Sequence, residues 1–389
     1  MKLLIPVAAG VEQIVKRQLQ KLGYDKTPAF SGRIALEGDW ADVARLSVFL
    51  RSGERVLIEL ACFPARTFDE LYEGFYAIPW EHYLCMDSKI LMDGKSVQST
   101  LAAIKAAGGV AKKAIICRLA DKLKSGRRTF TEDGARSIIG CSIVQDMVTV
   151  TLDTTGDGLH KRGYRTLSVA APIKETLAAA IIDSTFYNPD QDSEKPFADV
   201  FCGSGTFPIE AAMKAWNIAP GARRSFDFER WNFVDKTHIA RAREEARDKE
   251  TRGRVVNIFG GDVNGKAVEI ARQHARQAGV EGAIRFEKAD ARTFTSSTPY
   301  GVLVSNPPYG ERLMEEAEVR TLMREFGKTF FALPDWNAYL FTSLPDFERY
   351  FGKTADKKKR FSNANLPCGL YSYYGKPPKL NGDRNKIKR

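Results

Sequence analysis

The spacing of apolar residues changes about halfway along this chain, and the change predicts two architectures. In the first part, short runs of Ile, Leu and Val at 34–36 and 56–60 predict strands. Residues 10–22 and 42–50 instead place apolar side chains at helical spacing, so both are predicted helices. Strands and helices that alternate in this way favour a small α+β domain.

The following stretch continues with short elements. The pattern predicts one strand, one helix and a hairpin of two strands, at 89–92, 109–119, 138–144 and 147–152. In the helix, Ile115, Leu119 and Leu123 recur every four residues and lie on one face. We therefore expect a second α+β domain after the first.

Near residues 159–165 the chain becomes basic, and we place a domain junction there. Pro172 then begins an alanine-rich helix at 173–186, because proline is tolerated in a first helical turn. Five apolar runs follow, with helices such as 209–214 and 265–278 between them, at 196–200, 255–260, 283–288, 300–305 and 337–342. Alternating strands and helices predict an α/β domain whose mostly parallel sheet has helices on both faces.

Composition limits the class of protein. The chain has 389 residues, of which 43% are hydrophobic, enough for two or three domains. No run of eighteen apolar residues predicts a membrane span, and residues 1–7 lack the features of a signal peptide, so we expect a cytoplasmic protein and no membrane contact. The last fourteen residues, 376–389, carry six basic side chains and one acid, and we expect a disordered tail.

Cysteine and charge narrow the candidates further. Six cysteines and four histidines are scattered without a C-x-x-C pair, so we predict no metal site and a reducing compartment. The net charge is +11, which is typical of a protein with a polyanionic partner such as nucleic acid. A merely basic protein stays possible on charge alone.

Residues 199–206, D-V-F-C-G-S-G-T, join a predicted strand to a predicted helix. Two glycines let the backbone approach a ligand closely, and a helix N-terminus offers free N–H groups. A dinucleotide fingerprint would need a third glycine where Pro208 stands, which disfavours nicotinamide binding. The alternative without a ligand is a tight strand-to-helix turn.

Two carboxylates follow the next two predicted strands. Asp262 is suited to accept hydrogen bonds from a ribose diol, and Asp290 to accept one from an exocyclic amine. Either residue alone would be read as a helix cap or a surface acid. At successive strand ends, however, both belong to the sheet edge where open α/β sheets bind ligands.

The fourth strand of this series ends in the tetrapeptide Asn306-Pro307-Pro308-Tyr309. Proline cannot donate to a sheet ladder, so the strand must stop there. The corner is stiff and carries an amide next to an aromatic ring. A turn with a packed tyrosine is the structural alternative.

These motifs together resemble the series found in class I S-adenosylmethionine (SAM)-dependent amino-methyltransferases. Residues 159–165 and 171–180 resemble the segment that joins a THUMP domain to the methyltransferase, residues 112–115 a THUMP helix, and 363–371 the last strand region. The likeness is greatest to bacterial THUMP-containing enzymes that make N2-methylguanosine in 23S ribosomal RNA. Val200 departs from the family, which usually has proline there.

The resemblance implies a Rossmann-like class I methyltransferase domain with a mostly parallel seven-stranded sheet, preceded by ferredoxin-like and THUMP domains. We predict the ferredoxin-like domain at 1–62, the THUMP domain at 63–160, the methyltransferase at 161–375 and a basic tail at 376–389. The implied cofactor is SAM, with S-adenosylhomocysteine (SAH) as product. Its predicted contacts are Asp199, Phe201, Cys202, Gly203, Ser204, Gly205, Thr206, Asp262, Val263, Asp290, Ala291 and Asn306.

The catalytic residues implied are Asn306, Pro307, Pro308 and Tyr309. The Asn306 side-chain oxygen and the Pro307 carbonyl would accept hydrogens from a nucleobase amine, while Tyr309 stacks on the base. We expect no metal and no covalent enzyme intermediate, and a monomer that binds ribosomal RNA. The predicted phosphate contacts are Lys112, Lys113, Arg127, Arg128, Arg162 and Arg165.

Other acceptors stay open. The same corner serves transfer RNA guanine, adenine N6 in DNA or a glutamine amide in a protein, since it does not distinguish amines. The basic, THUMP-like first half favours RNA. An RNA-binding assembly factor without activity is the alternative outside enzymes.

Overall fold

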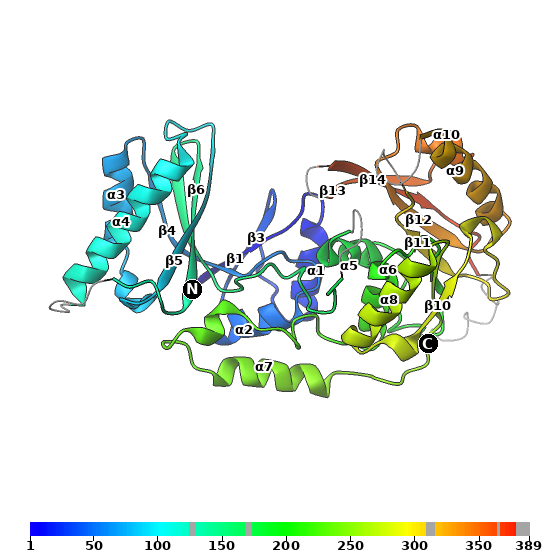
Figure 1. Ribbon diagram of the computed structural model, residues 1–389, viewed down its shortest axis with the longest axis horizontal. Helices are drawn as coiled ribbons and strands as arrows, with labels where there is room; N and C mark the ends of the chain where they lie inside the picture. Colours follow the sequence, from blue (N-terminus) through cyan, green and yellow to red (C-terminus); the bar gives the residue numbers. More distant parts are fainter. Residues whose placement is uncertain (124–129, 168–172, 309–315, 364–365, 379–389) are drawn as a thin grey trace, which may run out of the picture. The chain divides into compact units, whose positions relative to one another are not determined.

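The computed structural model describes residues 1–123, 130–167, 173–308, 316–363 and 366–378 and forms two compact units (Figure 1). The N-terminal unit contains Met1–Val7, Val15–Lys161 and Ala219–Asp248. The C-terminal unit contains Ala8–Ile14, Arg162–Ile218 and Lys249–Arg389.

One seven-stranded sheet runs through the N-terminal unit, in the order β2-β3-β1-β4-β7-β6-β5 among the described residues. The strands are β1 (Lys2–Pro6), β2 (Ala29–Phe30), β3 (Arg33–Glu37), β4 (Leu57–Pro64), β5 (Lys89–Val97), β6 (Arg136–Val144) and β7 (Met147–Asp153). Strand β4 pairs with β1 on one side and with β7 on the other. The predicted boundary at residue 62 therefore falls inside a strand that belongs to both parts of the sheet.

The helices of this unit follow local signals. They are α1 (Glu12–Lys21), which belongs to this unit from Val15 on, α2 (Trp40–Phe49), α3 (Phe68–Ala77) and α4 (Ile104–Lys122). Asp39 and Thr67 form capping boxes at the first residues of α2 and α3, which satisfies N–H groups that the helix leaves unpaired. Ile115 and Leu119 of α4 are buried as predicted, whereas Leu123 is 39% exposed just after the helix ends.

Residues Ala219–Asp248, from the middle of the predicted methyltransferase span, belong to the N-terminal unit. They contain the turn η2 (Asp227–Arg230) and helix α7 (Thr237–Asp248), which packs on α2. Arg136 binds Asp227 at 2.7 and 3.0 Å, and Arg45 binds Glu245 at 2.8 and 2.9 Å. These bidentate ion pairs attach residues 219–248 to the N-terminal unit. The spacing of apolar residues gave no sign that this segment leaves the methyltransferase span.

The C-terminal unit has a second seven-stranded sheet, in the order β10-β9-β8-β11-β12-β14-β13 within the described part of the chain. Its strands are β8 (Phe197–Asp199), β9 (Ile258–Asp262), β10 (Ile284–Lys288), β11 (Val302–Ser305), β12 (Asn337–Thr342), β13 (Lys357–Asn363) and β14 (Leu366–Tyr373). The first five pair in parallel, and β14 and β13 are antiparallel. The α/β prediction with a mostly parallel sheet is confirmed.

Helices cover both faces of this sheet (Figure 1). Helices α6 (Thr206–Ala215) and α8 (Gly265–Ala278) pack on β8, β9 and β10, with α5 (Glu175–Asp183) against α6. Helix α9 (Glu316–Phe331) and the short α10 (Phe347–Phe351) cover the other face. From α9, Val319, Met323, Phe326 and Phe330 are buried at i, i+4, i+7 and i+11 against Leu303 and Leu340, which is the apolar face of an amphipathic helix.

Most predicted elements are present, with two informative differences. Strand β9 begins at Ile258 rather than at residue 255. The apolar run in the sequence starts before the buried strand does, and Val255 is 68% exposed. Strand β13 was missed. Its first four residues, Lys357–Arg360, are all basic, and the strand lies at the sheet edge, where charged side chains protect a strand from aberrant pairing.

We predict that Gly327→Ala destabilises the C-terminal unit. A Cβ at Gly327 of α9 would lie 2.1 Å from the backbone oxygen of Phe351, at the point where α9 meets α10. Backbone atoms cannot rotate away, so the helices must separate, at a cost of about 1–3 kcal/mol. Calorimetric unfolding should show the loss, whereas the control Gly282→Ala, whose Cβ meets no atom within 4 Å, should not. Equal stability of the two variants would contradict this.

Candidate functional site

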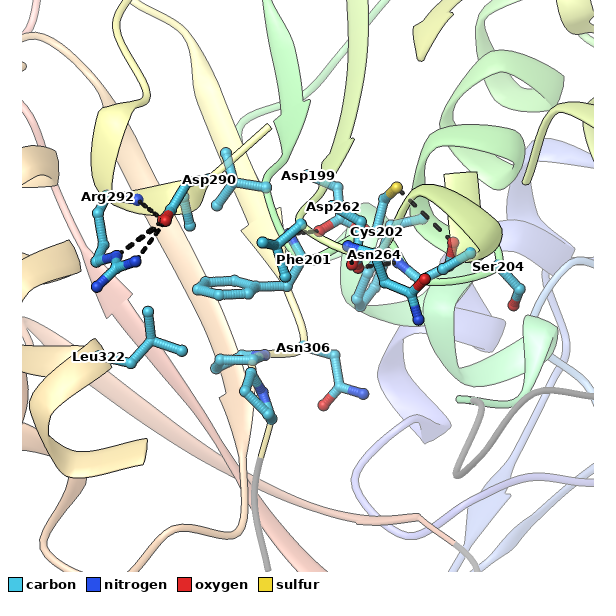
Figure 2. A pocket seen from close by; sticks show the side chains of 18 of the residues that line it. Asp199, Phe201, Cys202, Ser204, Asp262, Asn264, Asp290, Arg292, Asn306 and Leu322 are labelled. Carbon is cyan, nitrogen blue, oxygen red and sulfur yellow. Dashed lines mark hydrogen bonds and ion pairs between the residues drawn. The ribbon is translucent and has the colours of Figure 1, made fainter. Parts of the chain in front are cut away.

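The carboxyl ends of β8, β9, β10 and β11 share one edge of the C-terminal sheet, and a cavity of about 980 Å³ opens there (Figure 2). The strand pairing is parallel, so residues that follow these strands must meet. Asp199, Asp262, Asp290 and Asn306 all line this cavity. Four residues that are spread over more than one hundred positions of the sequence thus form one site.

The loop after β8 forms the turn that the glycines predicted. Gly203 and Gly205 adopt φ values of +51° and +83°, in the region that favours glycine. Gly205 is the N-cap of α6, and a Cβ there would lie 2.9 Å from the Ala271 side chain of α8. Glycine therefore allows the loop to fit between strand and helices, and residues 201–204 and 206 line the cavity.

Asp199 is a buried carboxylate with three polar neighbours. Its Oδ1 accepts hydrogen bonds from the Phe201 N–H at 3.1 Å and from the Ser305 hydroxyl at 2.7 Å. The Ser305 Oγ in turn accepts from the Val200 N–H at 3.0 Å. Burial raises the pKa of Asp199 to about 7, although these hydrogen bonds oppose the rise, and the charge of Asp262 adds to it.

Asp262 joins two loops at the end of β9. Its Oδ2 accepts from the Gly203 N–H at 2.9 Å, and its Oδ1 accepts from the Asn264 N–H at 2.9 Å. Each oxygen keeps a second lone pair, so the carboxylate can still accept hydrogen bonds from a diol. The Asn264 side chain in turn accepts from the Lys266 N–H at 3.0 Å and caps α8, so Asn264 has a structural role.

Asp290 caps the short turn η4 (Ala291–Thr293) that follows β10. Arg292 binds its carboxylate at 2.6 and 3.0 Å, and this guanidinium is the main reason that the pKa of Asp290 is lowered. Arg292 also reaches Glu325 of α9 at 2.9 Å. Asp290 is therefore charged and fixed at its end of the cavity (Figure 2).

Asn306 lies just beyond β11, beside Pro307 and Pro308 (Figure 2). Its Oδ1 is buried and has no hydrogen-bond partner among the described residues. A buried amide oxygen without a partner is costly, and a ligand that donates a hydrogen would remove that cost. The preceding residue, Ser305, anchors this corner to Asp199.

The structure brings most predicted cofactor contacts together. Gly205 is the exception, since it shapes the loop without lining the cavity, and Tyr309 lies outside the described residues. The sequence analysis did not predict Ser305, Arg292 or the residues of α9 that line the cavity. Ser305 was visible as a polar residue that ends an apolar run, whereas nothing local marked Arg292 or α9. Further lining residues that were missed are Ile173, Phe207, Lys266, Ile270, Leu322 and Glu325.

The predicted phosphate contacts separate into two groups. In the N-terminal unit, Lys113 is exposed and Lys112 pairs with Glu132 at 2.6 Å, while Arg127 and Arg128 lie outside the described residues. Arg162 is only 4% exposed, and it pairs with Glu210 of α6. We correct that prediction, because a guanidinium buried against a carboxylate is not available to a phosphate.

Arg165 also has an internal role. It donates to the Thr206 hydroxyl at 2.6 Å and to the Ile173 carbonyl at 3.0 Å, and it lies 3.5 Å from Glu175. These contacts hold Thr206, the first residue of α6. The guanidinium therefore supports the loop at residues 200–205, called the cofactor loop below, rather than an RNA strand. We withdraw Arg165 as a phosphate contact for the same reason.

His274 of α8 contacts the loop at residues 200–205. Its Nε2 accepts from the Leu167 N–H at 3.3 Å, so Nδ1 carries the hydrogen and donates to the Ser204 carbonyl at 3.2 Å. Burial lowers the pKa of His274, in agreement with a neutral ring. The loop is therefore fixed from both α6 and α8.

The described residues contain neither a candidate metal site nor a candidate membrane span. No cluster of three or more His, Cys, Asp or Glu side chains there is arranged to hold a metal ion. No helix in that part of the chain is long and apolar enough to cross a membrane.

Three family descriptions match the chain in succession. The RlmL ferredoxin-like domain matches residues 2–57, the THUMP domain matches 65–153, and the RMKL-like methyltransferase domain matches 162–372, more than half of the chain. The chain belongs to the RMKL-like methyltransferase family. The predicted resemblance to THUMP-containing methyltransferases is confirmed.

Relatives of this methyltransferase extend over nearly its whole length. YpsC of Bacillus subtilis is 39% identical over 369 residues, which is 94% of each chain. The ribosomal RNA large subunit methyltransferase K/L of Psychromonas ingrahamii is 32% identical over 381 residues, 95% of this chain and 49% of that protein. The chain thus spans about half the length of the K/L proteins it matches.

Solved structures with the same fold include two at high identity. The crystal structure of SMU.472 complexed with SAH is 41% identical with a TM-score of 0.91, covering 97% of this chain and 99% of that one. A predicted N6-adenine-specific DNA methylase from Listeria monocytogenes is 43% identical with a TM-score of 0.90, covering 96% of each chain.

We predict a pH-dependent stability difference between this methyltransferase and its Asp199→Asn variant. A carboxyl whose pKa rises from 3.8 to about 7 on folding binds a proton more tightly when folded, so its contribution to stability is lost as the pH rises from 4 to 7. Asparagine keeps the acceptor for Ser305 and Phe201 but does not titrate.

The measurement is denaturant unfolding of the cofactor-free protein at pH 5 and pH 8. We expect the wild type to lose about 2–3 kcal/mol more than Asp199→Asn over this interval. Asp248→Asn, at an exposed position, is the control and should behave as the wild type. Parallel pH profiles for all three proteins would show that Asp199 titrates normally.

Proposed function

We propose that this methyltransferase transfers a methyl group from SAM to the exocyclic N2 amine of a guanine in structured RNA, and that the RNA is 23S ribosomal RNA. The observation that carries the proposal is the buried Asn306 Oδ1 in the cavity at the end of β11, for which the described residues provide no hydrogen-bond donor. This acceptor has no structural use among the described residues, and an amine hydrogen is what it lacks.

The cavity fits SAM as the cofactor. Asp262 retains lone pairs for ribose hydroxyls, Asp290 retains one for an adenine amine, and Phe201, Leu322 and Ile270 supply apolar surface between them. The loop at residues 203–206 and the first turn of α6 would hold the methionine end. When bound, SAM supplies an electrophilic methyl group on a sulfonium.

Asn306 and the proline corner act on the acceptor amine. The lone pair of an exocyclic amine is delocalised into the base, which makes the nitrogen a poor nucleophile. Two acceptors aimed at its hydrogens favour the pyramidal, reactive form, and we assign this role to Asn306 Oδ1 and the Pro307 carbonyl. Because Pro307 and Pro308 restrict the backbone, these acceptors are arranged in advance.

No strong base is required in this scheme. Asn306 does not titrate, so the proton passes from the nitrogen to water after the methyl group has been transferred and SAH has formed, when the methylated nitrogen is cationic and acidic. The acceleration then comes from positioning and from preorganised acceptors. Stacking of the base on Tyr309 stays a prediction.

RNA is the proposed partner because of the N-terminal unit. A THUMP domain matches residues 65–153, and the K/L relatives are named for the large ribosomal subunit RNA. The net charge of +11 fits a polyanionic partner. We further propose a cytoplasmic enzyme that acts as a monomer.

One alternative has a specific observation behind it. The Listeria monocytogenes structure is described as a predicted N6-adenine-specific DNA methylase, and Asn306 and its prolines would serve adenine as well as guanine. A DNA enzyme has no evident need of a THUMP domain, and for that reason we favour RNA. Transfer RNA guanine is the nearest competing target.

Nucleoside mass spectrometry of a deletion strain decides between these targets. Loss of N2-methylguanosine from 23S ribosomal RNA, restored by the wild-type chain, would support the proposal. Loss from transfer RNA, loss of N6-methyladenine from DNA, or no change in any nucleoside would each contradict it, and the last would favour a non-catalytic RNA-binding factor.

For catalysis, we predict that Asn306→Ala lowers the methylation rate by more than about a hundredfold, since one preorganised acceptor is lost. SAH affinity, measured by calorimetry, should stay close to that of the wild type. Asn232→Ala, at an exposed position outside the cavity, should leave both unchanged. Retained turnover in Asn306→Ala would remove this residue from the mechanism.

For RNA binding, we predict that Lys113→Gln weakens affinity for ribosomal RNA and reduces the slope of log affinity against log salt by about one. Lys113 is exposed on α4 of the N-terminal unit, so removal of its charge should release one fewer counterion. The control is Lys353→Gln, an exposed lysine of the C-terminal unit. An equal loss in both variants would point to general charge rather than to a contact at Lys113.

A further inference from the structure

Three charged side chains form a chain of ion pairs at one end of the cavity. Asp290 follows β10, Arg292 lies in η4, and Glu325 comes from α9, and all three line the cavity. Arg292 contacts Asp290 at 2.6 and 3.0 Å and Glu325 at 2.9 Å (Figure 2 shows the first pair). An arginine therefore lies between two carboxylates and pairs with both.

The hydrogen bonds of Asp290 leave one free position. Its Oδ1 accepts from the Arg292 backbone N–H at 2.9 Å, and its Oδ2 accepts from Arg292 Nη2 at 2.6 Å. The single hydrogen of Arg292 Nε is shared between the two oxygens, at 3.0 Å from each. Three hydrogens therefore reach a carboxylate that has about four acceptor sites, so one site remains for a ligand.

A single charged acceptor selects between two kinds of group. An exocyclic amine donates a hydrogen to the remaining acceptor site of Asp290 and satisfies it. A carbonyl at the same place would set two acceptor oxygens against each other and leave both unpaired in a partly buried site. The direction in which the Asp290 carboxylate points thus decides how well the site distinguishes adenine from hypoxanthine.

Arg292 sets that direction, and α9 holds Arg292. Besides the ion pair with Glu325, the Arg292 carbonyl accepts from the Thr329 hydroxyl at 2.6 Å, so η4 is attached to α9 at two points. The planar guanidinium contacts both oxygens of Asp290 and fixes its rotation in a way that a lysine cannot.

We propose that Arg292, held by Glu325, is a positioning residue that orients Asp290 toward the adenine amine of the cofactor and so sets the preference of the site for adenosine over inosine cofactors. The inference rests on the proposed cofactor. It adds Arg292, Glu325 and helix α9 to the elements that determine cofactor specificity.

The exposure of these side chains makes the proposal testable. The side chains of Arg292 and Glu325 are 49% and 45% exposed, and exposed ion pairs contribute little to folding. Variants at either position should therefore fold. Arg276 and Glu281 form a similar exposed bidentate pair, at 2.8 and 2.9 Å, away from the cavity, and provide the matched control.

The experiment measures calorimetric affinities of SAH and S-inosylhomocysteine for the full chain. For the wild type we expect SAH to bind roughly tenfold to a hundredfold more tightly. Arg292→Lys and Glu325→Gln should reduce this ratio by about threefold or more, mainly because they lower the affinity for SAH. Arg276→Lys should leave the ratio unchanged.

Each other outcome has a definite meaning. If Arg292→Lys weakens both ligands equally, the residue only supports the wall of the cavity and the proposal is wrong. If the ratio stays at the wild-type value in both variants, Asp290 orients itself and the proposal is also wrong. If the wild type binds neither ligand, the proposed cofactor fails instead.

Discussion

The Ser305 hydroxyl joins the two strands on which the site depends. It donates to Asp199 at the end of β8 and accepts from the Val200 N–H, and the next residue is Asn306. Asp199 is buried, so its carboxylate needs these partners to avoid the cost of an unpaired charge. Satisfying Asp199 therefore fixes the distance between the cofactor loop and the proline corner. In the proposed reaction this contact would help to set the position of the acceptor amine relative to the cofactor, because the loops that would hold them follow neighbouring strands of a packed sheet.

Much of the C-terminal fold could be predicted because its signals are local. Buried parallel strands give continuous apolar runs, and α8 shows helical spacing, so their order alone implied a parallel sheet with helices on both faces. The insertion at Ala219–Asp248 could not be predicted in the same way. Its attachment to the N-terminal unit depends on Arg136 with Asp227 and Arg45 with Glu245, pairs 91 and 200 residues apart. Periodicity says nothing about which distant charges meet.

The residues of the candidate site also fall into two groups, those marked by a local signal and those that depend on tertiary contacts. Asp199, Asp262, Asp290 and Asn306 were predictable because each follows a recognisable strand, and parallel strands bring their carboxyl ends to one edge. Arg292 and Glu325 were not, since their importance arises only when α9 folds over η4. The first group would contact the cofactor and the acceptor, and the second would orient one member of the first, Asp290. A strand-end pattern thus finds the contacting residues, while the residues that position them require the tertiary structure.

The basic segment at 159–165 shows why charge in sequence overstates the RNA surface. Arg162 and Arg165 look like phosphate contacts, yet both are occupied by Glu210, Glu175 and the first turn of α6. Arginine is well suited to such internal use, because its planar group binds several acceptors at once and is less strongly hydrated than lysine. Lys113 has no comparable ion pair among the described residues, and the strongly hydrated charge of a lysine favours the surface. The RNA-contacting surface should therefore be sought among the lysines of the N-terminal unit rather than in the arginine-rich segment beside the cofactor loop.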